Sequence, residues 1–340
     1  MNGVVRIGVL GCADIAVRRV LPSLAGMDSA RLVAVGSRDP DRAERVARRF
    51  GATPVAGYDH VVARDDVDAV YIPLPPASHH RWIVESLRAG KHVLAEKPLC
   101  TNAADTAEVV TLARERGLVL VENFFFPHHS QHRMVQDLVR DGVIGEVRAF
   151  SSAFGIPPVD RSSFRYRTDL GGGALLDVGV YPLRAARLHL GDDLRVAGAW
   201  LRADGPTGVD TAGAALLSTG YGVAVHADFG FEHAYRSDYV LWGSAGMISV
   251  PRAFTPPEHL RPTVRVEEQD RVTEHSLPPD DQVRNALRAF VDAVLGRAPA
   301  PAGEQAVRHA ALVDEVRAVA TPPACAHRSP PRSENPCVSC

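Results

Sequence analysis

An apolar segment near the N-terminus runs into a glycine-containing turn and then into a helical pattern. Residues 4–10 are nearly all apolar, which is typical of a parallel strand covered on both faces. A turn begins at Gly11, and residues 17–25 follow with helical spacing. This arrangement places backbone N–H groups and the positive end of a helix dipole against a pyrophosphate. It predicts a dinucleotide site whose first cofactor-binding residues are Gly11, Cys12, Ala13, Asp14 and Ile15.

The turn departs at one position from the dinucleotide pattern G-x-G-x-x-G/A. Gly11 and Ala16 match the pattern, but Ala13 replaces the second glycine, which normally lets the backbone approach the phosphate. A methyl group must therefore be accommodated there. Taken alone, the segment also fits an ordinary strand, turn and helix.

The end of the second predicted strand, residues 31–36, indicates which dinucleotide binds. NAD-selective folds carry an acidic residue near this strand end, whereas NADP-selective folds carry an arginine. Ser37 can hydrogen-bond a 2′-phosphate, and Arg38 can pair with it and stack on adenine. Asp39 would favour NAD, but it lies beyond the expected position. We therefore expect NADP as the cofactor.

Strands and helices continue to alternate until about residue 122. Strands are expected at 68–74, 91–95 and 118–121, and helices at 41–50, 75–89 and 101–116. This alternation predicts a Rossmann domain, a doubly wound parallel sheet, over residues 1–122. Leu74 ends a strand on the side where such sheets bind ligands, so we expect it at the cofactor. His79, at the next helix start, can reach a nicotinamide ribose or simply cap the helix.

The segment Glu96-Lys97-Pro98 follows another of these strands, at its carboxyl end. The chain has only two lysines, Lys91 and Lys97, while its other basic residues apart from histidine are arginines. A lysine at this position suggests a compact donor whose pKa can shift. The alternative is a solvated strand end with no catalytic role.

After residue 122 the pattern changes to strands without intervening helices. Alternating apolar and polar residues predict strands at 145–153, 195–202, 210–218, 222–231, 237–242 and 246–250. Such alternation suits an open, mostly antiparallel sheet with one packed face. Amphipathic helices are expected at 131–140, 281–295 and 303–319, and the last should return to pack near the first domain. The sequence thus predicts an α/β protein with a second α/β domain over residues 123–320.

A glycine run precedes an aspartate and a tyrosine in the segment from Gly171 to Tyr181. Asp177 and Tyr181 stand four residues apart, so on a helix their Cβ atoms lie about 5–6 Å apart on one face. The glycines let the chain turn sharply into that helix. A capped core helix with a buried tyrosine is the simpler interpretation, but it leaves this clustering unexplained.

The glycine turn, the Glu96-Lys97-Pro98 segment and the Gly171–Tyr181 block together resemble the Gfo/Idh/MocA oxidoreductases. The resemblance covers the chain to about residue 320. It implies a Rossmann domain, a C-terminal domain whose open sheet commonly forms subunit contacts, and a catalytic lysine, here Lys97. We therefore expect a homo-oligomer, a dimer or a tetramer. It also implies that Glu96 and Lys97 lie at the cofactor.

A family pattern of aspartate followed four residues later by histidine maps onto Asp177 and Tyr181. Tyrosine does not shuttle protons near neutrality, so this departure favours a reductase needing a proton donor. Within the family, the tyrosine and the segment 122–132 look most like the sugar-nucleotide 3-ketoreductases of antibiotic deoxysugar pathways. Lys97 or Tyr181 would then give the proton, and Asp177 would orient the substrate hydroxyls or Lys97.

Residues 157–167 supply the predicted substrate contacts. This segment carries three arginines and two aromatic residues just before the glycine run. Arginine binds phosphate oxygens bidentately, and aromatic rings suit a base or a sugar face. Arg165 is the arginine that the ketoreductase resemblance favours, and Tyr235 is the candidate from the open sheet. With Asp177 and Tyr181, these two residues are the predicted substrate-binding residues. We expect a nucleotide-diphosphate 3-keto-deoxysugar as substrate, and the resemblance implies thymidine as its base. A solvated loop is the commoner meaning of such a run.

Two other functions remain open at the level of sequence. One is an NADP-dependent free-sugar or dihydrodiol dehydrogenase of the same family, against which Tyr181 argues. The other is a non-catalytic NADP-binding sensor, which would not need Lys97, Asp177 and Tyr181 together.

Composition excludes several other classes. The formal net charge of −2 argues against general affinity for nucleic acid or anionic membrane. No apolar run reaches the length of a membrane span, and the N-terminus lacks a signal peptide's hydrophobic region, so a cytoplasmic protein is expected. Residues 321–340 are expected to be a disordered tail. Its Cys325, Cys337 and Cys340 have zinc-like spacing, but without a second pair in a folded context we expect no metal site.

Overall fold

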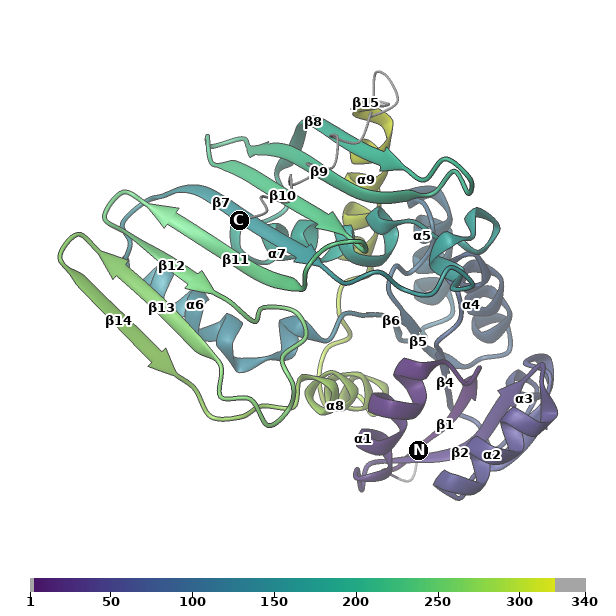
Figure 1. Ribbon diagram of the computed structural model, residues 1–340. Helices are drawn as coiled ribbons and strands as arrows, with labels where there is room; N and C mark the ends of the chain where they lie inside the picture. The colour runs from purple at the N-terminus through teal and green to yellow at the C-terminus, as the bar shows by residue number, and fades with distance from the viewer. Residues whose placement is uncertain (1–2, 322–340) are drawn as a thin grey trace, which may run out of the picture.

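The computed structural model describes residues 3–321 and contains two sheets (Figure 1). The strands of the first sheet are β1 (Val5–Leu10), β2 (Ala30–Ser37), β3 (Thr53–Ala56), β4 (Ala69–Ile72), β5 (His92–Glu96) and β6 (Leu120–Asn123). The helices between them are α1 (Leu21–Ala25), α2 (Pro40–Phe50), α3 (Asp59–Val62), α4 (His79–Arg88) and α5 (Ala103–Glu115).

All strands of the first sheet run parallel, in the order β3-β2-β1-β4-β5-β6. The predicted doubly wound parallel sheet is confirmed. The chain leaves β1 toward β2 on one side and returns to β4 on the other, so the strand order reverses between β1 and β4. In open α/β sheets, ligands bind at the carboxyl ends of the strands beside such a reversal.

The second sheet follows along the chain and is larger. Its strands are β7 (Val147–Gly155), β8 (Leu194–Ala203), β9 (Asp210–Thr219), β10 (Ala224–Gly230), β11 (Arg236–Gly243), β12 (Gly246–Val250), β13 (Thr263–Glu268), β14 (Arg271–Ser276) and β15 (Ala320–Thr321). Their order is β14-β13-β12-β11-β7-β10-β9-β8-β15, and only the β7–β10 and β8–β15 pairs are parallel. The predicted mostly antiparallel sheet is confirmed.

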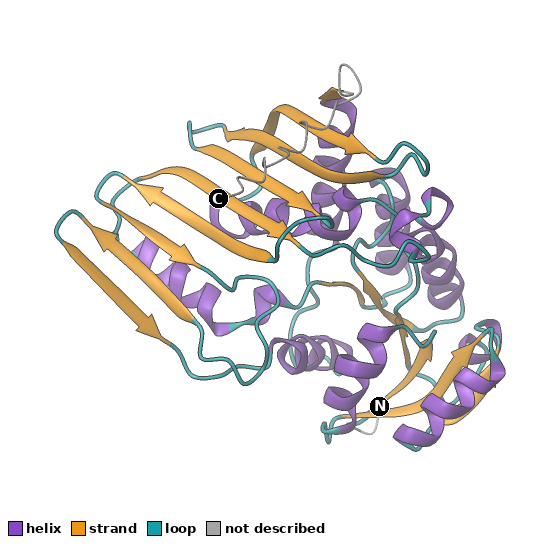
Figure 2. Cartoon of the chain, viewed as in Figure 1, coloured by secondary structure: helices purple, strands orange, loops and turns teal. Residues whose placement is uncertain are grey.

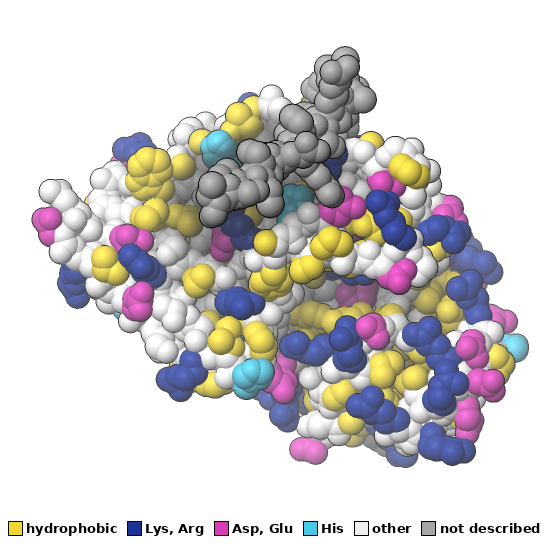
Figure 3. All heavy atoms as spheres, in the orientation of Figure 1, with side chains coloured by type: hydrophobic (Ala, Val, Ile, Leu, Met, Phe, Trp, Pro, Cys, Tyr) yellow, Lys and Arg dark blue, Asp and Glu magenta, His cyan; other side chains and the backbone are white. Residues whose placement is uncertain are grey.

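Helices cover one face of this second sheet, and none of the described helices covers the other, here called the open face (Figure 2). The covering helices are α6 (Ser130–Arg140), α7 (Val180–Leu190) and α9 (Gly303–Val319). Inward residues of the strands, such as Tyr239 and Leu241 on β11, are fully buried against them. Outward residues include Trp200, Leu216 and Trp242, whose large apolar side chains are exposed. Figure 3 shows hydrophobic side chains, in yellow, at several places on the visible face of the molecule.

Two C-terminal helices tie the halves of the molecule together. Helix α8 (Gln282–Val294) packs its apolar face into the core of the first domain, alongside α1. A division at residue 122 therefore leaves one helix of the first core in the second half of the sequence. Helix α9 contacts α5, where Asp314 Oδ2 accepts a hydrogen bond from Ala103 N at 2.7 Å. This contact confirms the predicted return of the last helix.

Within residues 3–321, none of the helices is long and apolar enough to cross a membrane. The predicted tail lies outside the described residues except for Thr321, which ends β15. Its three cysteines, Cys325, Cys337 and Cys340, are also outside them.

Candidate active site

Lys97 follows β5 at the carboxyl edge of the first sheet and contacts the helical segment that leads into α7. Its Nζ donates to the main-chain oxygen of Asp177 at 2.6 Å and to Asp177 Oδ1 at 3.1 Å. The Lys97 side chain is 13% exposed and that of Asp177 is 10% exposed. The two predicted residues, 80 positions apart in sequence, therefore form a largely buried ion pair.

The glycine run fixes where Asp177 lies. Gly171 and Gly173 have φ values of 76° and 118°, which favour glycine over other residues. A Cβ on Gly172 would lie 2.5 Å from the main-chain oxygen of Arg165, and one on Gly173 would lie 2.3 Å from Asp210 Oδ1. Asp210 Oδ2 also accepts from Leu175 N, at 2.5 Å. The three glycines thus let the chain pass close to Arg165 and Asp210 just before the helical segment that carries Asp177.

Asp177 also binds a second cation. Arg165 Nε donates to Asp177 Oδ2 at 2.5 Å, on the opposite carboxylate oxygen from Lys97. Burial alone would raise the pKa of Asp177, but the charges of Lys97 and Arg165 outweigh it and lower the pKa to about 2. Asp177 is therefore a carboxylate at any pH at which the protein would function.

Tyr181 lies beside this pair. Its ring centroid is 5.2 Å from Lys97 Nζ, and it packs against Phe124 and Phe154. Asp177 belongs to a π-helical segment, Leu175–Gly179, that leads into α7, so the two residues do not share one regular α-helix. Burial raises the pKa of Tyr181, which keeps its hydroxyl protonated as a donor. No described residue hydrogen-bonds that hydroxyl.

Glu96 precedes Lys97 but points into the first domain. Its Oε1 accepts from Tyr71 O–H at 2.7 Å and from Asn123 Nδ2 at 2.8 Å. Burial raises the pKa of Glu96, and these two donors hold it in place between β4 and β6. The neighbouring Glu122 accepts from Leu99 N at 3.0 Å, which fixes the turn after Lys97. Sequence reasoning missed these supports, although a tyrosine inside an apolar strand signals a buried hydroxyl that needs a partner.

The predicted cofactor turn has a backbone that only glycine suits. Gly11 has a φ of 117°, and a Cβ on it would lie 2.8 Å from Leu74 Cδ2. Leu74 therefore packs directly on the turn, where it was predicted to meet the cofactor. Cys12 is buried, and Asp14 is exposed and pairs with Arg18 at 2.8 Å. Ile15 packs on the core of the first domain.

The end of β2 presents a cationic surface. Ser37 is buried, and its Oγ accepts from Asp39 N at 3.1 Å. The Asp39 carboxylate caps α2 by accepting from Arg42 N at 3.1 Å, so it is engaged in a structural role. Arg38 is exposed. Arg42 was not predicted, yet its Nη2 donates to the Cys12 main-chain oxygen at 2.6 Å and joins α2 to the glycine turn. The sequence did offer a signal for Arg42, namely a basic residue in the first turn of the helix that follows β2.

His79 is fully buried at the start of α4. Its Nδ1 lies 2.8 Å from the main-chain oxygen of Pro98, and its Nε2 lies 2.7 Å from that of Leu74. Burial lowers its pKa. The imidazole thus links the turn after Lys97 to the turn after β4. This favours a supporting role, and the contact with a nicotinamide ribose stays a prediction.

The arginine-rich segment divides its side chains among different partners. Arg161 pairs with Asp204 at 2.9 Å, and Arg167 forms a two-point pair with Asp169 at 2.6 and 2.8 Å. Only Arg165 of the three reaches Asp177. Tyr235 lies before β11, half exposed, with Arg252 stacked 4.9 Å above its ring. Its hydroxyl lies 2.7 Å from Thr255 Oγ1.

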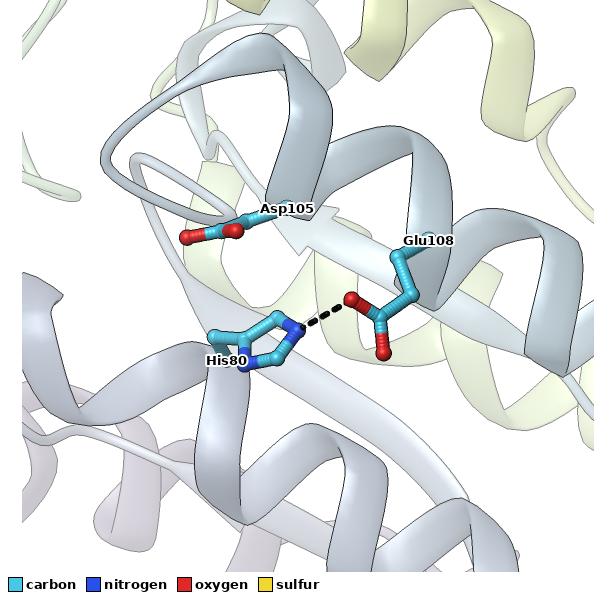
Figure 4. Close-up of side chains that lie close together, drawn as sticks. All are labelled: His80, Asp105 and Glu108. Atoms are coloured by element: carbon cyan, nitrogen blue, oxygen red, sulfur yellow. Dashed lines mark hydrogen bonds and ion pairs between the residues drawn. The ribbon is translucent and has the colours of Figure 1, made fainter.

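A separate cluster on the first domain joins α4 and α5 (Figure 4). His80 Nε2 lies 3.0 Å from Glu108 Oε2, with Asp105 beside them. Asp105 also accepts from Asn102 Nδ2 at 2.9 Å. These side chains form a contact between α4 and α5 at the surface of the first domain.

Comparison with known proteins now places the chain in a family. The family model described as "Oxidoreductase family, NAD-binding Rossmann fold" matches residues 5–124, and the model of the GFO/IDH/MocA C-terminal domain matches residues 132–249. The chain is a member of the Gfo/Idh/MocA oxidoreductases. The predicted family resemblance is confirmed.

Several Gfo/Idh/MocA proteins are close to this chain. One from Actinomadura kijaniata, named dTDP-3,4-didehydro-2,6-dideoxy-alpha-D-glucose 3-reductase, is 51% identical over 92% of this chain and 95% of its own. A protein of the same name from Saccharopolyspora spinosa is 51% identical over 93% and 97%. A solved 3-ketoreductase from Actinomadura kijaniata, in complex with NADP and TDP-benzene, has a TM-score of 0.92 at 50% identity. That match covers 94% of this chain and 98% of the solved chain.

Proposed function

We propose that this protein is an NADPH-dependent reductase of the C-3 ketone of a dTDP-linked 3-keto-deoxysugar, as in deoxysugar biosynthesis. The observation that carries the proposal is the cluster of Lys97, Asp177 and Tyr181 beside the carboxyl end of β5. Relatives with 51% identity are named as reductases of this class of ketone. A neighbour with a TM-score of 0.92 was solved with NADP and a TDP compound.

The first domain fits a phosphorylated dinucleotide. Gly11 gives the turn after β1 a positive φ, and a Cβ there would meet Leu74, which fits the first glycine of a dinucleotide turn. Arg38 and Arg42 follow β2, where the adenosine 2′-phosphate of NADP would lie, and Ser37 adds a hydroxyl. Asp39, the residue that would favour NAD, is engaged as the cap of α2. These residues fit NADP better than NAD.

In the proposed reaction, bound NADPH would supply the hydride to the ketone carbon. Negative charge develops on the ketone oxygen, and preorganised donors at that oxygen are usually the largest catalytic contribution. An ammonium has three N–H donors. Lys97 uses two of them on Asp177, which leaves one for the ketone oxygen. The protonated hydroxyl of Tyr181 is the second donor, and Asp177 fixes the position of the Lys97 ammonium through their ion pair.

Cofactor preference gives a test of the first domain. We expect NADPH to bind about ten- to hundredfold more tightly than NADH, because charge-assisted contacts to the 2′-phosphate contribute about 1.5–3 kcal/mol. Arg38→Ala should remove much of that preference without changing NADH affinity. Fluorescence titration of both cofactors measures it. Arg48→Ala is the matched control, because Arg48 lies in the last turn of α2, the helix that follows Arg38, and its side chain pairs with no described residue other than Glu44. Equal affinity of the wild-type protein for the two cofactors contradicts the assignment.

We also propose that the open face of the second sheet forms a subunit contact in a homo-oligomer. Trp242 on this face is 62% exposed, and Leu216 and Trp200 add further exposed apolar surface. Exposed apolar patches of this kind commonly mark interaction sites. Sedimentation of the wild-type protein and of Trp242→Glu tests this proposal. A monomeric wild-type protein contradicts it.

A further inference from the structure

We propose that Arg165 is a positioning residue that couples recognition of the substrate's diphosphate to the placement of Lys97. The proposal rests on the proposed function. The contacts form a continuous series in which Arg165 holds one oxygen of the Asp177 carboxylate and Lys97 is held by the other. Any ligand that fixes Arg165 therefore also restrains the carboxylate that orients the proton donor.

The guanidinium of Arg165 forms a hydrogen bond through Nε, and its two Nη groups are left to bind a ligand. Its Nε donates to Asp177 Oδ2, whereas neither Nη group hydrogen-bonds a described residue. The side chain is 30% exposed, against 10% for Asp177 and 13% for Lys97. Arg165 thus extends from the buried ion pair toward the surface. The planar fork of an arginine can bind two phosphate oxygens with its Nη groups while Nε keeps another partner.

The backbone of Arg165 is coupled to Asp177 as well. Its main-chain oxygen accepts from Gly173 N at 3.0 Å, four residues before Asp177. The same oxygen lies 2.5 Å from where a Cβ on Gly172 would be, so the two segments are packed without space between them. Movement of Arg165 therefore displaces the start of the helical segment that carries Asp177. Arg165 is therefore linked to Asp177 both through its side chain and through its backbone.

The neighbouring arginines lack this connection. Arg167 is engaged at two points by Asp169, which belongs to the same exposed turn. Arg161 pairs with Asp204 and stacks on Tyr166. Arg167 lies two residues from Arg165, carries the same charge and contacts neither Lys97 nor Asp177 in the described structure. It provides a matched control for the general effect of removing a cation from this segment.

A residue that only anchors the diphosphate and one that also positions Lys97 differ in their kinetics. Loss of a simple anchor raises KM and leaves kcat unchanged, because ground state and transition state lose the same interaction. Loss of a positioning residue also lowers kcat, because the donor is misplaced at saturation. Displacements of about 1 Å at a reacting group cost about 10²-fold in rate.

The test compares wild-type protein, Arg165→Ala, Arg165→Lys and Arg167→Ala with a dTDP-linked 3-keto-deoxysugar and NADPH. We expect Arg165→Ala to lower kcat by about 10- to 100-fold at saturation, in addition to raising KM. Added guanidinium should restore part of kcat, and Arg165→Lys should lie between wild type and alanine because it keeps the charge but loses the fork. Arg167→Ala should keep the wild-type kcat.

The possible outcomes separate this inference from the proposed function. Wild-type protein that does not reduce the linked ketone contradicts the function itself. Wild-type turnover combined with a raised KM and an unchanged kcat in Arg165→Ala shows an anchor only and overturns the coupling. Should the alanine variant lose NADPH binding, the lysine variant decides, since it retains the cation: an unchanged kcat in Arg165→Lys also overturns the coupling.

Discussion

Replacement of Lys97 by alanine is expected to lower kcat by about 10²- to 10⁴-fold, the usual contribution of a positioned acid or base. Lys97 is the proposed donor to the ketone oxygen, and its Nζ is held by the main-chain oxygen and Oδ1 of Asp177. Tyr181→Phe should have a smaller effect, because Lys97 still donates to the developing oxyanion. The double variant should be far slower than either single variant, since each donor partly covers the loss of the other.

Single-turnover and steady-state kinetics with NADPH measure these rates. Lys91→Ala is the matched control, because Lys91 is the other lysine of the chain and its Nζ donates only to main-chain oxygens of Arg64 and Val67. It should keep the wild-type kcat. NADPH affinity should survive Tyr181→Phe. A double variant that turns over at the wild-type rate rules out both residues as the donors.

Acidification below about pH 6.5 is expected to destabilise the second domain, because buried histidines would have to take up protons. His132 is buried and His189 is half-buried where α6, α7 and β11 meet, and His309 is buried on α9. Burial lowers the pKa of all three, that of His189 to about 3, and the neighbouring histidines lower that of His132 further. The ordinary pKa of histidine is about 6.5.

The sign of the effect follows from where the protons bind. Below about pH 6.5 the unfolded chain takes up protons that the folded chain refuses, so the free energy of unfolding falls as the pH falls. At pH 4.5, two units below that value, His189 alone costs about 3 kcal/mol. His132 and His309 act in the same direction, and a whole domain is stable by only about 5–15 kcal/mol. Asp177 stays charged throughout this range, because its pKa of about 2 is lower still.

Denaturant unfolding between pH 7.5 and 4.5 tests this prediction. The wild-type free energy of unfolding should fall steadily below pH 6.5, and His189→Leu should show a shallower decline. His259→Leu removes an exposed histidine and should leave the decline unchanged. A stability that is constant between pH 7 and 4.5 contradicts a core of neutral histidines.

Local patterns predicted those parts of the site that depend on local backbone geometry. Gly11 and the Gly171–Gly173 run were recognisable because glycine marks positions where a Cβ cannot fit or where φ is positive. Lys97 stood out because it follows an apolar strand in a chain with only one other lysine. The strand pattern likewise indicated both sheets, since covered and half-covered strands differ in their alternation.

Contacts between distant segments could not be predicted in this way. The bonds from Tyr71 and Asn123 to Glu96 join three strands, and the bond from Arg42 to Cys12 joins a helix to a turn. Strands β13 and β14 were missed because they end the sheet and carry many charged residues, which blunts the apolar alternation. The return of α8 to the first domain depends on packing against α1 and the core beneath it, which lie far away in the sequence.

The central claim is tested most directly by comparing a dTDP-linked 3-keto-deoxysugar with the same sugar without its nucleotide. NADPH consumption is followed for both substrates under identical conditions. The account predicts that kcat/KM is far higher for the linked sugar, because Arg165 would bind the diphosphate that the free sugar lacks. Equal kcat/KM for the two substrates contradicts a sugar-nucleotide reductase and favours a free-sugar enzyme of the same family.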